Sequence, residues 1–244
     1  MNSNQHWLKP NWPAPNNIHA ATTLRTGGVS LGEYDSLNPA SHVGDDSALV
    51  TCNRRIIRSM LNLPSEPVWL NQTHSNIAVQ AIANPNALDA DASFTEEPGI
   101  VCAVMTADCL PLLACSSDGT KIAAIHAGWR GLLNGIIDNT LSALQTTDLL
   151  IWLGPAIGSE QFEVGEEVRS LFLSKSMNYA LAFKQSAPEK WLADIYELAR
   201  INLRTLGIGK IYGGHYCTVT DKKQFYSYRR DKVTGRMATL IWRD

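Results

Sequence analysis

The sequence contains few charged residues, and their signs are nearly balanced. They make up 18% of the 244 positions, and the formal net charge at pH 7 is -2. Proteins that track a phosphate backbone or an anionic membrane surface usually carry a concentrated basic patch, which this composition does not indicate. We therefore expect neither nucleic acid nor a membrane among the partners.

Long apolar runs and paired cysteines are also missing. No apolar stretch is long enough to cross a bilayer, and residues 1–15 lack the basic start and apolar core of a signal peptide. The five cysteines are odd in number and form no Cys-x-x-Cys pair, so neither a disulfide framework nor a zinc ribbon is indicated. We expect a cytoplasmic protein with reduced thiols.

No internal repeat, low-complexity segment or Pro/Ser-rich linker divides the chain. The hydrophobic content of 45% is enough for a substantial core. We expect one domain over residues 1–244, with roughly the first 15 residues peripheral to it.

Hydrophobic periodicity predicts alternating strands and helices. Apolar stripes at helical spacing recur in several segments, and short apolar runs, some of them rich in β-branched residues, lie between them. This alternation indicates an α/β or α+β fold. The predicted strands are residues 19–24, 77–82, 101–106, 121–125, 149–153 and 237–242, and the predicted helices are 47–61, 132–144, 162–172 and 194–206.

The stretch from residue 101 to residue 131 contains the most reactive side chains. Asp108 and Cys109 follow one predicted strand, and His126 follows the next. Upstream, His74 follows another short apolar strand. Because rigid scaffolds commonly present functional groups where strands end in loops, these side chains are candidates for a common site.

Two chemical interpretations of this set remain open from the residues alone. His74, Cys109 and His126 can hold a zinc ion with three protein ligands and an open fourth position, as catalytic zinc sites do. Alternatively, Cys109 is a thiol nucleophile, with His126 or His74 as its base and Asp108 orienting that base. A buried thiol and a hydrogen-bonded core histidine are the simpler structural explanations.

Several segments outside this stretch can bind anions or line a pocket. Arg25 precedes the glycine pair of a loop, which predicts either an anion-binding nest or a tight turn. Three arginines near the end of the chain, Arg229, Arg230 and Arg236, suit phosphate or carboxylate, or else lie on the surface of a hairpin. The loop at residues 89–93 carries two carboxylates that bind a cation or remain solvated. The candidates for substrate or phosphate binding are Arg25, Gly27, Gly28, Asn38, Gln72, Arg229 and Arg230.

A set of motifs in fixed order resembles the laccase-domain (YfiH-like) family over about residues 19–242. The two most specific motifs are Ala-Asp-Cys-Leu-Pro, ending at Pro111, and His-Ala-Gly-Trp-Arg-Gly, beginning at His126. The others are Arg25-Thr-Gly-Gly-Val-Ser30, Asn71-Gln-Thr-His74, Gly154-Pro155 and Ser227-Tyr-Arg-Arg230.

The resemblance implies a domain of mixed central sheets flanked by helices in α/β/β/α-like layers, and a zinc ion on His74, Cys109 and His126. It implies a purine nucleoside phosphorylase that cleaves adenosine, inosine and methylthioadenosine with inorganic phosphate. Adenosine deamination is a companion reaction. Asp108, Cys109 and His126 are then the catalytic residues. We expect a monomer or a homodimer.

The family is also associated with two other activities. One is hydrolytic editing of UDP-linked muropeptide precursors, and the other is copper-dependent polyphenol oxidation, so Cu²⁺ is the alternative metal. A multicopper centre is disfavoured because a site of two histidines and a cysteine leaves only four of the six histidines for further copper ions.

Overall fold

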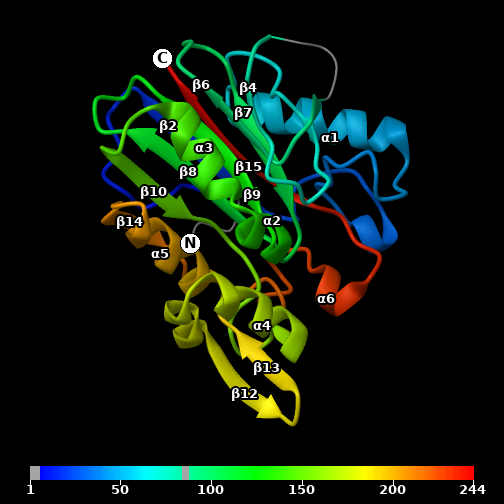
Figure 1. Cartoon of the computed structure of the whole chain (residues 1–244). Helices are drawn as coiled ribbons and strands as arrows, with labels where there is room; N and C mark the ends of the chain where they lie inside the picture. Colours follow the sequence, from blue (N-terminus) through cyan, green and yellow to red (C-terminus); the bar gives the residue numbers. More distant parts are fainter. Residues whose placement is uncertain (1–5, 84–87) are drawn as a thin grey trace.

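Two β-sheets pack face to face at the centre of the computed structural model, which describes residues 6–83 and 88–244 (Figure 1). Within the described residues, the first sheet has four strands in the order β1 (Trp7–Leu8), β2 (Ile18–Thr23), β15 (Met237–Arg243) and β7 (Cys102–Thr106). The second has six, in the order β14 (Lys210–Gly213), β10 (Leu149–Leu153), β8 (Leu110–Ser116), β9 (Ile122–Ala127), β6 (Ala92–Thr95) and β4 (Ala78–Gln80).

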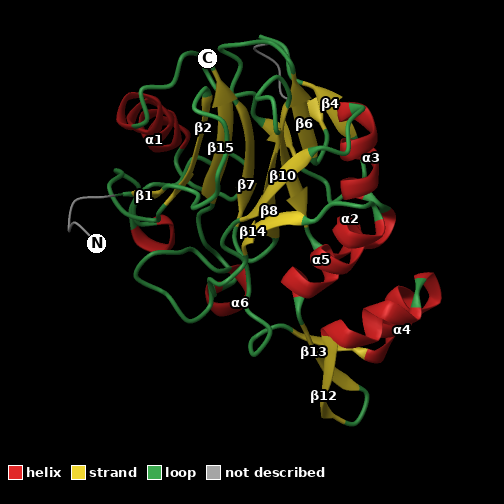
Figure 2. Ribbon diagram, turned by 90° about the vertical axis from the view of Figure 1, so that its left-hand side faces the viewer, coloured by secondary structure: helices red, strands yellow, loops and turns green. Residues whose placement is uncertain are grey.

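Helices cover the outer face of each sheet, so the layers run helix, sheet, sheet, helix (Figure 2). One apolar cluster fills the space between the sheets and contains Val104, Leu113 and Trp152. The predicted α/β class with α/β/β/α-like layers is confirmed. On the four-stranded sheet lies α1 (Ser47–Met60); on the six-stranded sheet lie α2 (Trp129–Asn134), α3 (Ile136–Leu144) and α5 (Ile195–Thr205).

A smaller unit projects from the sheets and is seen at the bottom of Figures 1 and 2. It includes a sheet whose strands lie in the order β11 (Glu163–Gly165), β13 (Lys190–Ala193) and β12 (Phe183–Ala187), with α4 (Glu166–Lys175) and the 3-10 helix η2 (Met177–Ala182). The remaining elements are the 3-10 helix η1 (Gly32–Tyr34), the parallel pair β3 (Leu70–Asn71) and β5 (Leu88–Asp89), and α6 (Tyr228–Asp231).

The ends of the longer helices follow from local capping. The carboxylate of Asp46 accepts hydrogen bonds from the backbone N–H groups of Ala48 and Leu49, which caps the start of α1. Asp194 does the same for the N–H of Glu197 at the start of α5. The predicted helices 47–61 and 194–206 are confirmed within a residue at each end. None of the helices in the described ranges is long and apolar enough to span a bilayer.

Two predicted helices differ from those observed. The helix expected over 132–144 is broken at Gly135, whose φ of 86° is left-handed and ends α2 before α3 begins. The helix expected over 162–172 begins only at Glu166, because residues 163–165 pair with β13 as strand β11. That pairing joins segments more than twenty residues apart, so helical periodicity did not reveal it.

The expected loop at residues 89–93 is a further difference. Leu88–Asp89 and Ala92–Thr95 are strands, and Asp91 between them is fully buried. The two alternatives considered for its carboxylate, cation binding or solvation, are both wrong for Asp91, because its oxygens are hydrogen-bonded to the backbone N–H groups of Thr73 and His74, to the Ser75 hydroxyl and to the His126 ring.

Candidate active site

His74, Cys109 and His126 meet at one edge of the central sheets. Their nearest ligand atoms all lie within 4.8 Å of one another. The Cys109 sulfur is 3.7 Å from Nε2 of His74, and the two imidazole rings meet edge to face with centroids 4.9 Å apart. The structure therefore brings this sequence-predicted trio together.

Strand pairing explains how residues so distant in sequence come together. Strands β8 and β9 are antiparallel and pair Pro111 with His126, so Cys109, just before β8, lies beside the histidine. All six residues of β9 are buried, and His126 is the polar one among them. His74 is exposed and Cys109 half-buried. The trio thus opens to solvent on the His74 side.

Asp91 holds the imidazole ring of His126 and the backbone at His74. One carboxylate oxygen lies 2.7 Å from Nδ1 of His126, which leaves Nε2 of that ring for a metal. The same carboxylate accepts hydrogen bonds from the backbone N–H groups of Thr73, His74 and Ser75 and from the Ser75 hydroxyl. Burial alone would raise the pKa of Asp91, but the hydrogen bonds from His126 and Ser75 lower it to about 2. Asp91 is therefore an ionised anchor beneath the trio.

Electrostatics at the trio favour a thiolate. Burial would raise the pKa of Cys109, but hydrogen bonds with His126 and His74 bring it well below its usual value. Burial likewise opposes protonation of His126, but hydrogen bonds with Asp91 and Cys109 raise its pKa. The thiolate is the form that binds metal, and a bound ion would displace the proton from His126, so the donor set of one thiolate and two imidazoles fits a zinc ion with a free coordination position.

The backbone is strained on both sides of the trio. His74 has φ 61° and Asp108 has φ 90°, both in the left-handed region that non-glycine residues seldom adopt. Such strain persists only where surrounding contacts hold the backbone in place. At His74 the contact is a hydrogen bond from its backbone N–H to the Asp91 carboxylate. For Asp108, the contacts come from its own carboxylate, which accepts hydrogen bonds of 2.6 Å from the Thr218 hydroxyl and from the Arg229 N–H.

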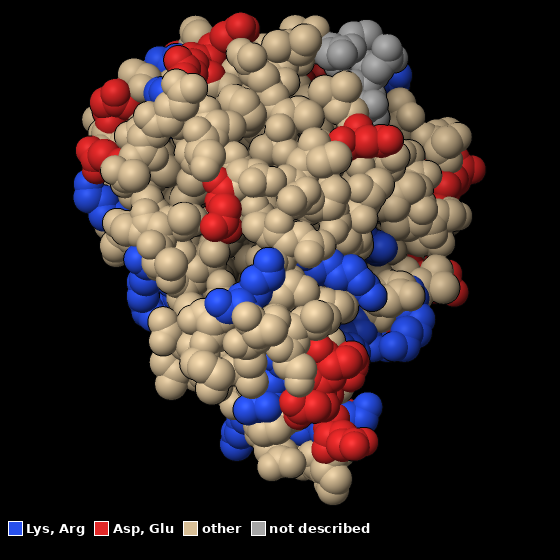
Figure 3. Space-filling model, in the orientation of Figure 1, with Lys and Arg blue, Asp and Glu red and all other residues tan. Residues whose placement is uncertain are grey.

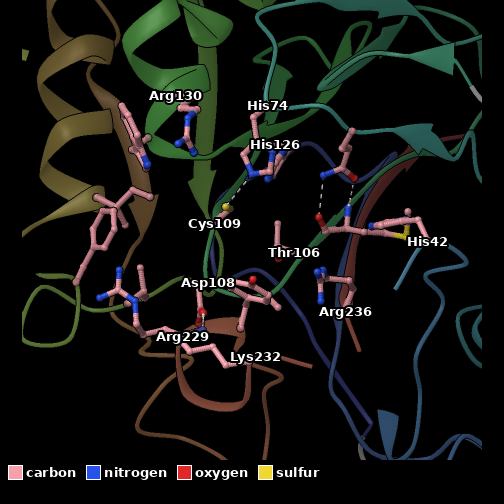
Figure 4. A pocket seen from close by; sticks show the side chains of 18 residues that line it. His42, His74, Thr106, Asp108, Cys109, His126, Arg130, Arg229, Lys232 and Arg236 are labelled. Atoms are coloured by element: carbon pink, nitrogen blue, oxygen red, sulfur yellow. Dashed lines mark hydrogen bonds between the residues drawn. The ribbon is translucent and has the colours of Figure 1, made fainter. Parts of the chain in front are cut away.

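A pocket of about 550 Å³ opens beside the trio (Figure 4). Figure 4 shows Arg130 and Arg229 on one side, His42 and Arg236 on the other, and Cys109 between them. On this face of the molecule, basic side chains gather where the sheets meet the projecting unit (Figure 3). The lining residues are His42, Gln72, His74, Met105, Thr106, Ala107, Asp108, Cys109, His126, Trp129, Arg130, Ile157, Phe162, Ile195, Tyr228, Arg229, Lys232 and Arg236.

Three of the other sequence candidates also line this pocket. Gln72 does so, but its side-chain amide is occupied with the backbone N–H and carbonyl of Met105. Arg229 lines the pocket while its Nη1 donates to the carbonyls of Gln161 and Glu163. Asp108 also lines the pocket, and both of its carboxylate oxygens accept hydrogen bonds. In the thiol interpretation Asp108 was to orient the base, but it is Asp91 that contacts His126.

The remaining candidates lie outside the pocket lining. Arg25 donates to the carbonyls of Asp35 and Lys222 and stacks on the Tyr226 ring. Arg230 donates to backbone carbonyls, including that of Thr218, and to Asp231.

The glycine pair and Asn38 are internal parts of the fold. Gly27 has a φ of 91°, and the Gly28 N–H donates to the Ser36 hydroxyl. A Cβ atom on Gly28 would overlap the Ser36 carbonyl oxygen. Asn38 is fully buried and accepts a hydrogen bond from the Arg236 N–H.

Sequence reasoning overlooked several pocket residues. Arg130 belongs to the His-Ala-Gly-Trp-Arg-Gly motif that begins at His126, so this motif could have identified it as a pocket residue. Arg236, directly before β15, was grouped with Arg229 and Arg230 but not chosen as a phosphate candidate, because nothing local indicated that it faces the trio. His42 and Lys232 occupy loop segments without a recognisable pattern.

Comparisons with known proteins agree with this geometry. A family model described as multi-copper polyphenol oxidoreductase laccase matches residues 19–244. A relative from Escherichia coli (strain K12) named purine nucleoside phosphorylase YfiH is 50% identical over 238 residues, covering 96% of this chain and 98% of that protein. A Haemophilus influenzae relative named purine nucleoside phosphorylase is 46% identical over 239 residues, covering 96% and 98%.

Solved structures show the same fold. The crystal structure of a Neisseria meningitidis protein, NMB0706, matches with a TM-score of 0.95 and 46% identity over 98% of this chain and 100% of that chain. The structure of YlmD from Geobacillus stearothermophilus matches with a TM-score of 0.94 and 28% identity over 100% and 98%.

Proposed function

The chain belongs to the YfiH-type laccase-domain family, and from that premise we propose that it is a zinc-dependent purine nucleoside phosphorylase. Its substrates are adenosine, inosine and methylthioadenosine, each cleaved by inorganic phosphate. The observation that carries this proposal is the pocket, in which a metal-binding trio lies among cationic and aromatic side chains.

The reaction needs a site for an anion, a ribose and a purine at once. An oxygen of phosphate forms a bond to the anomeric carbon of the ribose, while the bond from that carbon to the purine nitrogen breaks. The purine leaves with the bonding electrons and takes up a proton, and the other product is ribose 1-phosphate or its methylthio analogue. Holding both substrates in one pocket lowers the entropic part of the barrier.

Charge in the pocket suits this anionic co-substrate. The lining includes the cationic side chains of Arg130, Arg229, Lys232 and Arg236, whereas the carboxylate of Asp108 is occupied by hydrogen bonds. Cationic groups in a partly closed pocket raise the local concentration of phosphate and stabilise negative charge in the transition state.

His74, Cys109 and His126 are the residues that hold the zinc in this proposal. A zinc ion bound there supplies Lewis acidity to the pocket. Asp91 keeps Nε2 of His126 directed at the site by binding Nδ1. Adenosine deamination, which needs water in place of phosphate, is proposed as a companion reaction of the same pocket.

The donor set does not favour a multicopper oxidase. Within residues 6–83 and 88–244, one group of three His or Cys side chains can hold a metal ion. His6 bonds the Thr26 hydroxyl, and His19 pairs with Asp244 and stacks on Trp242. These histidines are therefore engaged away from the trio, although Cu²⁺ competes with Zn²⁺ for a site of this composition.

Product analysis tests the proposed function. Metal-loaded protein is incubated with adenosine, inosine or methylthioadenosine, with and without inorganic phosphate, and the products are separated by chromatography. We expect free base to appear only when phosphate is supplied, and His126→Ala to release none. Base release that ignores phosphate, or cleavage of a UDP-linked muropeptide precursor without any nucleoside turnover, would replace the phosphorylase with a hydrolase.

A further inference from the structure

The two sides of the pocket differ in chemistry. On one side, aromatic rings lie beneath exposed or half-buried arginines: Arg130 is 4.5 Å from the Trp129 ring centroid, and Arg229 is 5.5 Å from that of Phe162. Both arginines are on the same side in Figure 4. Flat, polarisable rings of this kind provide a stacking surface for a heteroaromatic base.

The other side is polar and contains an unused buried hydroxyl. Thr106 ends strand β7, lines the pocket and is 2% exposed. Its Oγ1 atom has no hydrogen-bond partner among the residues that the structure describes. Because a buried polar atom without a partner is costly, a Thr106 hydroxyl in this position indicates a ligand atom that binds it.

Arg236 lies beside this hydroxyl in Figure 4 and is held in place by its own loop. Nη1 donates to the carbonyls of Thr234 and Gly235, and the backbone N–H donates to Oδ1 of Asn38. No carboxylate pairs with the Arg236 guanidinium within the described ranges. A half-buried guanidinium that is fixed in this way and lacks an anionic partner is prepared to bind an oxyanion.

We propose that Arg236 and Thr106 form the subsite for inorganic phosphate, and that the purine lies across the pocket against Trp129 and Phe162. The inference rests on the proposed phosphorylase function, and it fixes the direction in which the nucleoside binds. The guanidinium fork pairs with phosphate oxygens, and the Thr106 hydroxyl donates to one of them. The ribose then lies between the two sides, beside the trio.

The arginines on the aromatic side are less suited to this role. Backbone carbonyls hold Nη1 of Arg229 as they hold that of Arg236, but the Arg229 guanidinium lies over the Phe162 ring, on the side of the pocket assigned to the base. Arg130 is exposed, so ordering its long side chain around phosphate costs more conformational entropy than using Arg236, which is already fixed.

A matched pair of hydroxyl-removing variants tests the subsite. Thr106 and Ser93 are both buried, and neither hydroxyl has a partner in the described residues, but only Thr106 lines the pocket. Valine has nearly the shape of threonine, and alanine that of serine, so each change removes only the hydroxyl. We expect Thr106→Val to raise the KM for phosphate by about tenfold or more, with the KM for nucleoside changed little. We expect Ser93→Ala to leave both constants near the wild-type values.

Thermal unfolding separates a binding role from a structural one. Because the Thr106 hydroxyl binds nothing within the described fold, Thr106→Val should keep or slightly raise the Tm. Arg236→Lys, which keeps the charge and loses the planar fork, should also raise the KM for phosphate. Unchanged KM values for phosphate in both variants, beside normal wild-type phosphorolysis, overturn the subsite and leave the proposed function intact.

Direct binding covers the case in which wild-type protein does not consume phosphate. That result overturns the phosphorylase function, and titration of metal-loaded protein with inorganic phosphate, followed by ³¹P NMR, then decides the subsite. Weaker phosphate binding in Thr106→Val than in Ser93→Ala supports it. Equal binding in the two variants, or no binding to the wild-type protein, overturns it.

Discussion

Two parts of the molecule combine arginine with glycine, and they place the arginine differently. In the loop at residues 25–30, the guanidinium of Arg25 donates to the carbonyls of Asp35 and Lys222 and lies outside the pocket lining. Arg236 also donates to backbone carbonyls, those of Thr234 and Gly235, but it lines the pocket beside the trio. Backbone contacts fix both guanidinium groups, and the comparison teaches that their position relative to the pocket is what distinguishes them.

The largest expected effect comes from removing one of the proposed metal ligands, Cys109. Cys109→Ala leaves two imidazoles, which bind zinc far more weakly than the full set does. We expect the variant to fold, to lose its zinc in elemental analysis and to lose phosphorolysis by about a thousandfold or more. Cys217→Ala, at a half-buried thiol outside the trio, is the control. Full zinc occupancy in Cys109→Ala would remove that residue from the site.

The next effect tests how the trio is supported. Asp91→Asn keeps the shape of the side chain but removes the charge and one acceptor atom that serve His126 and the 73–75 backbone. We expect zinc affinity to fall by roughly 10–100-fold in competition with a chelator. An affinity equal to that of the wild-type protein would show that the histidines are oriented without Asp91.

On the loop side, Gly28→Ala should damage stability and leave the pocket unchanged. The added methyl group would overlap the Ser36 carbonyl and the Leu37 backbone. Overpacking of this kind costs about 1–3 kcal/mol of the free energy of unfolding, measurable by urea denaturation. If instead stability held and only the KM for phosphate rose, the loop would be an anion site after all.

Arg25→Ala should have the smallest effect of the four. The substitution removes hydrogen bonds to two backbone carbonyls and the stacking on Tyr226 at a partly exposed position. We expect the free energy of unfolding to fall by about 1 kcal/mol. We expect the KM for phosphate to stay within about twofold of the wild-type value, because each tenfold change needs 1.4 kcal/mol of binding energy and Arg25 lies outside the pocket lining. A large rise in that KM would move the anion site from Arg236 to Arg25.

Local patterns in the sequence predicted the parts of the fold that depend on neighbouring residues. Apolar stripes and capping residues identified α1 and α5, and β-branched runs identified β7 and β10. Pairings between distant segments were not predictable in this way. The residues of strand β11 were expected to be helical. The strand was not recognised because its partner, β13, lies more than twenty residues further along the chain and leaves no local signal.

The same distinction applies to the site. His74, Cys109 and His126 were identified as a set because each follows a strand, and the structure places them together. The carboxylate that orients His126 was not identified, because Asp91 looked like an ordinary turn residue until β6 and β9 were seen to enclose it. Nor could the sequence show that Arg236 lines the pocket whereas Arg25 lies outside it.

The origin of the oxygen on the sugar product tests the central claim most directly. Metal-loaded wild-type protein is given inosine and phosphate in which every oxygen is ¹⁸O, and the products are analysed by mass spectrometry. Since phosphorolysis joins a phosphate oxygen to the anomeric carbon, we expect ribose 1-phosphate that retains all of the label, formed in amounts equal to the free base. Free ribose with an oxygen from unlabelled water, and labelled phosphate left unconsumed, would contradict the account.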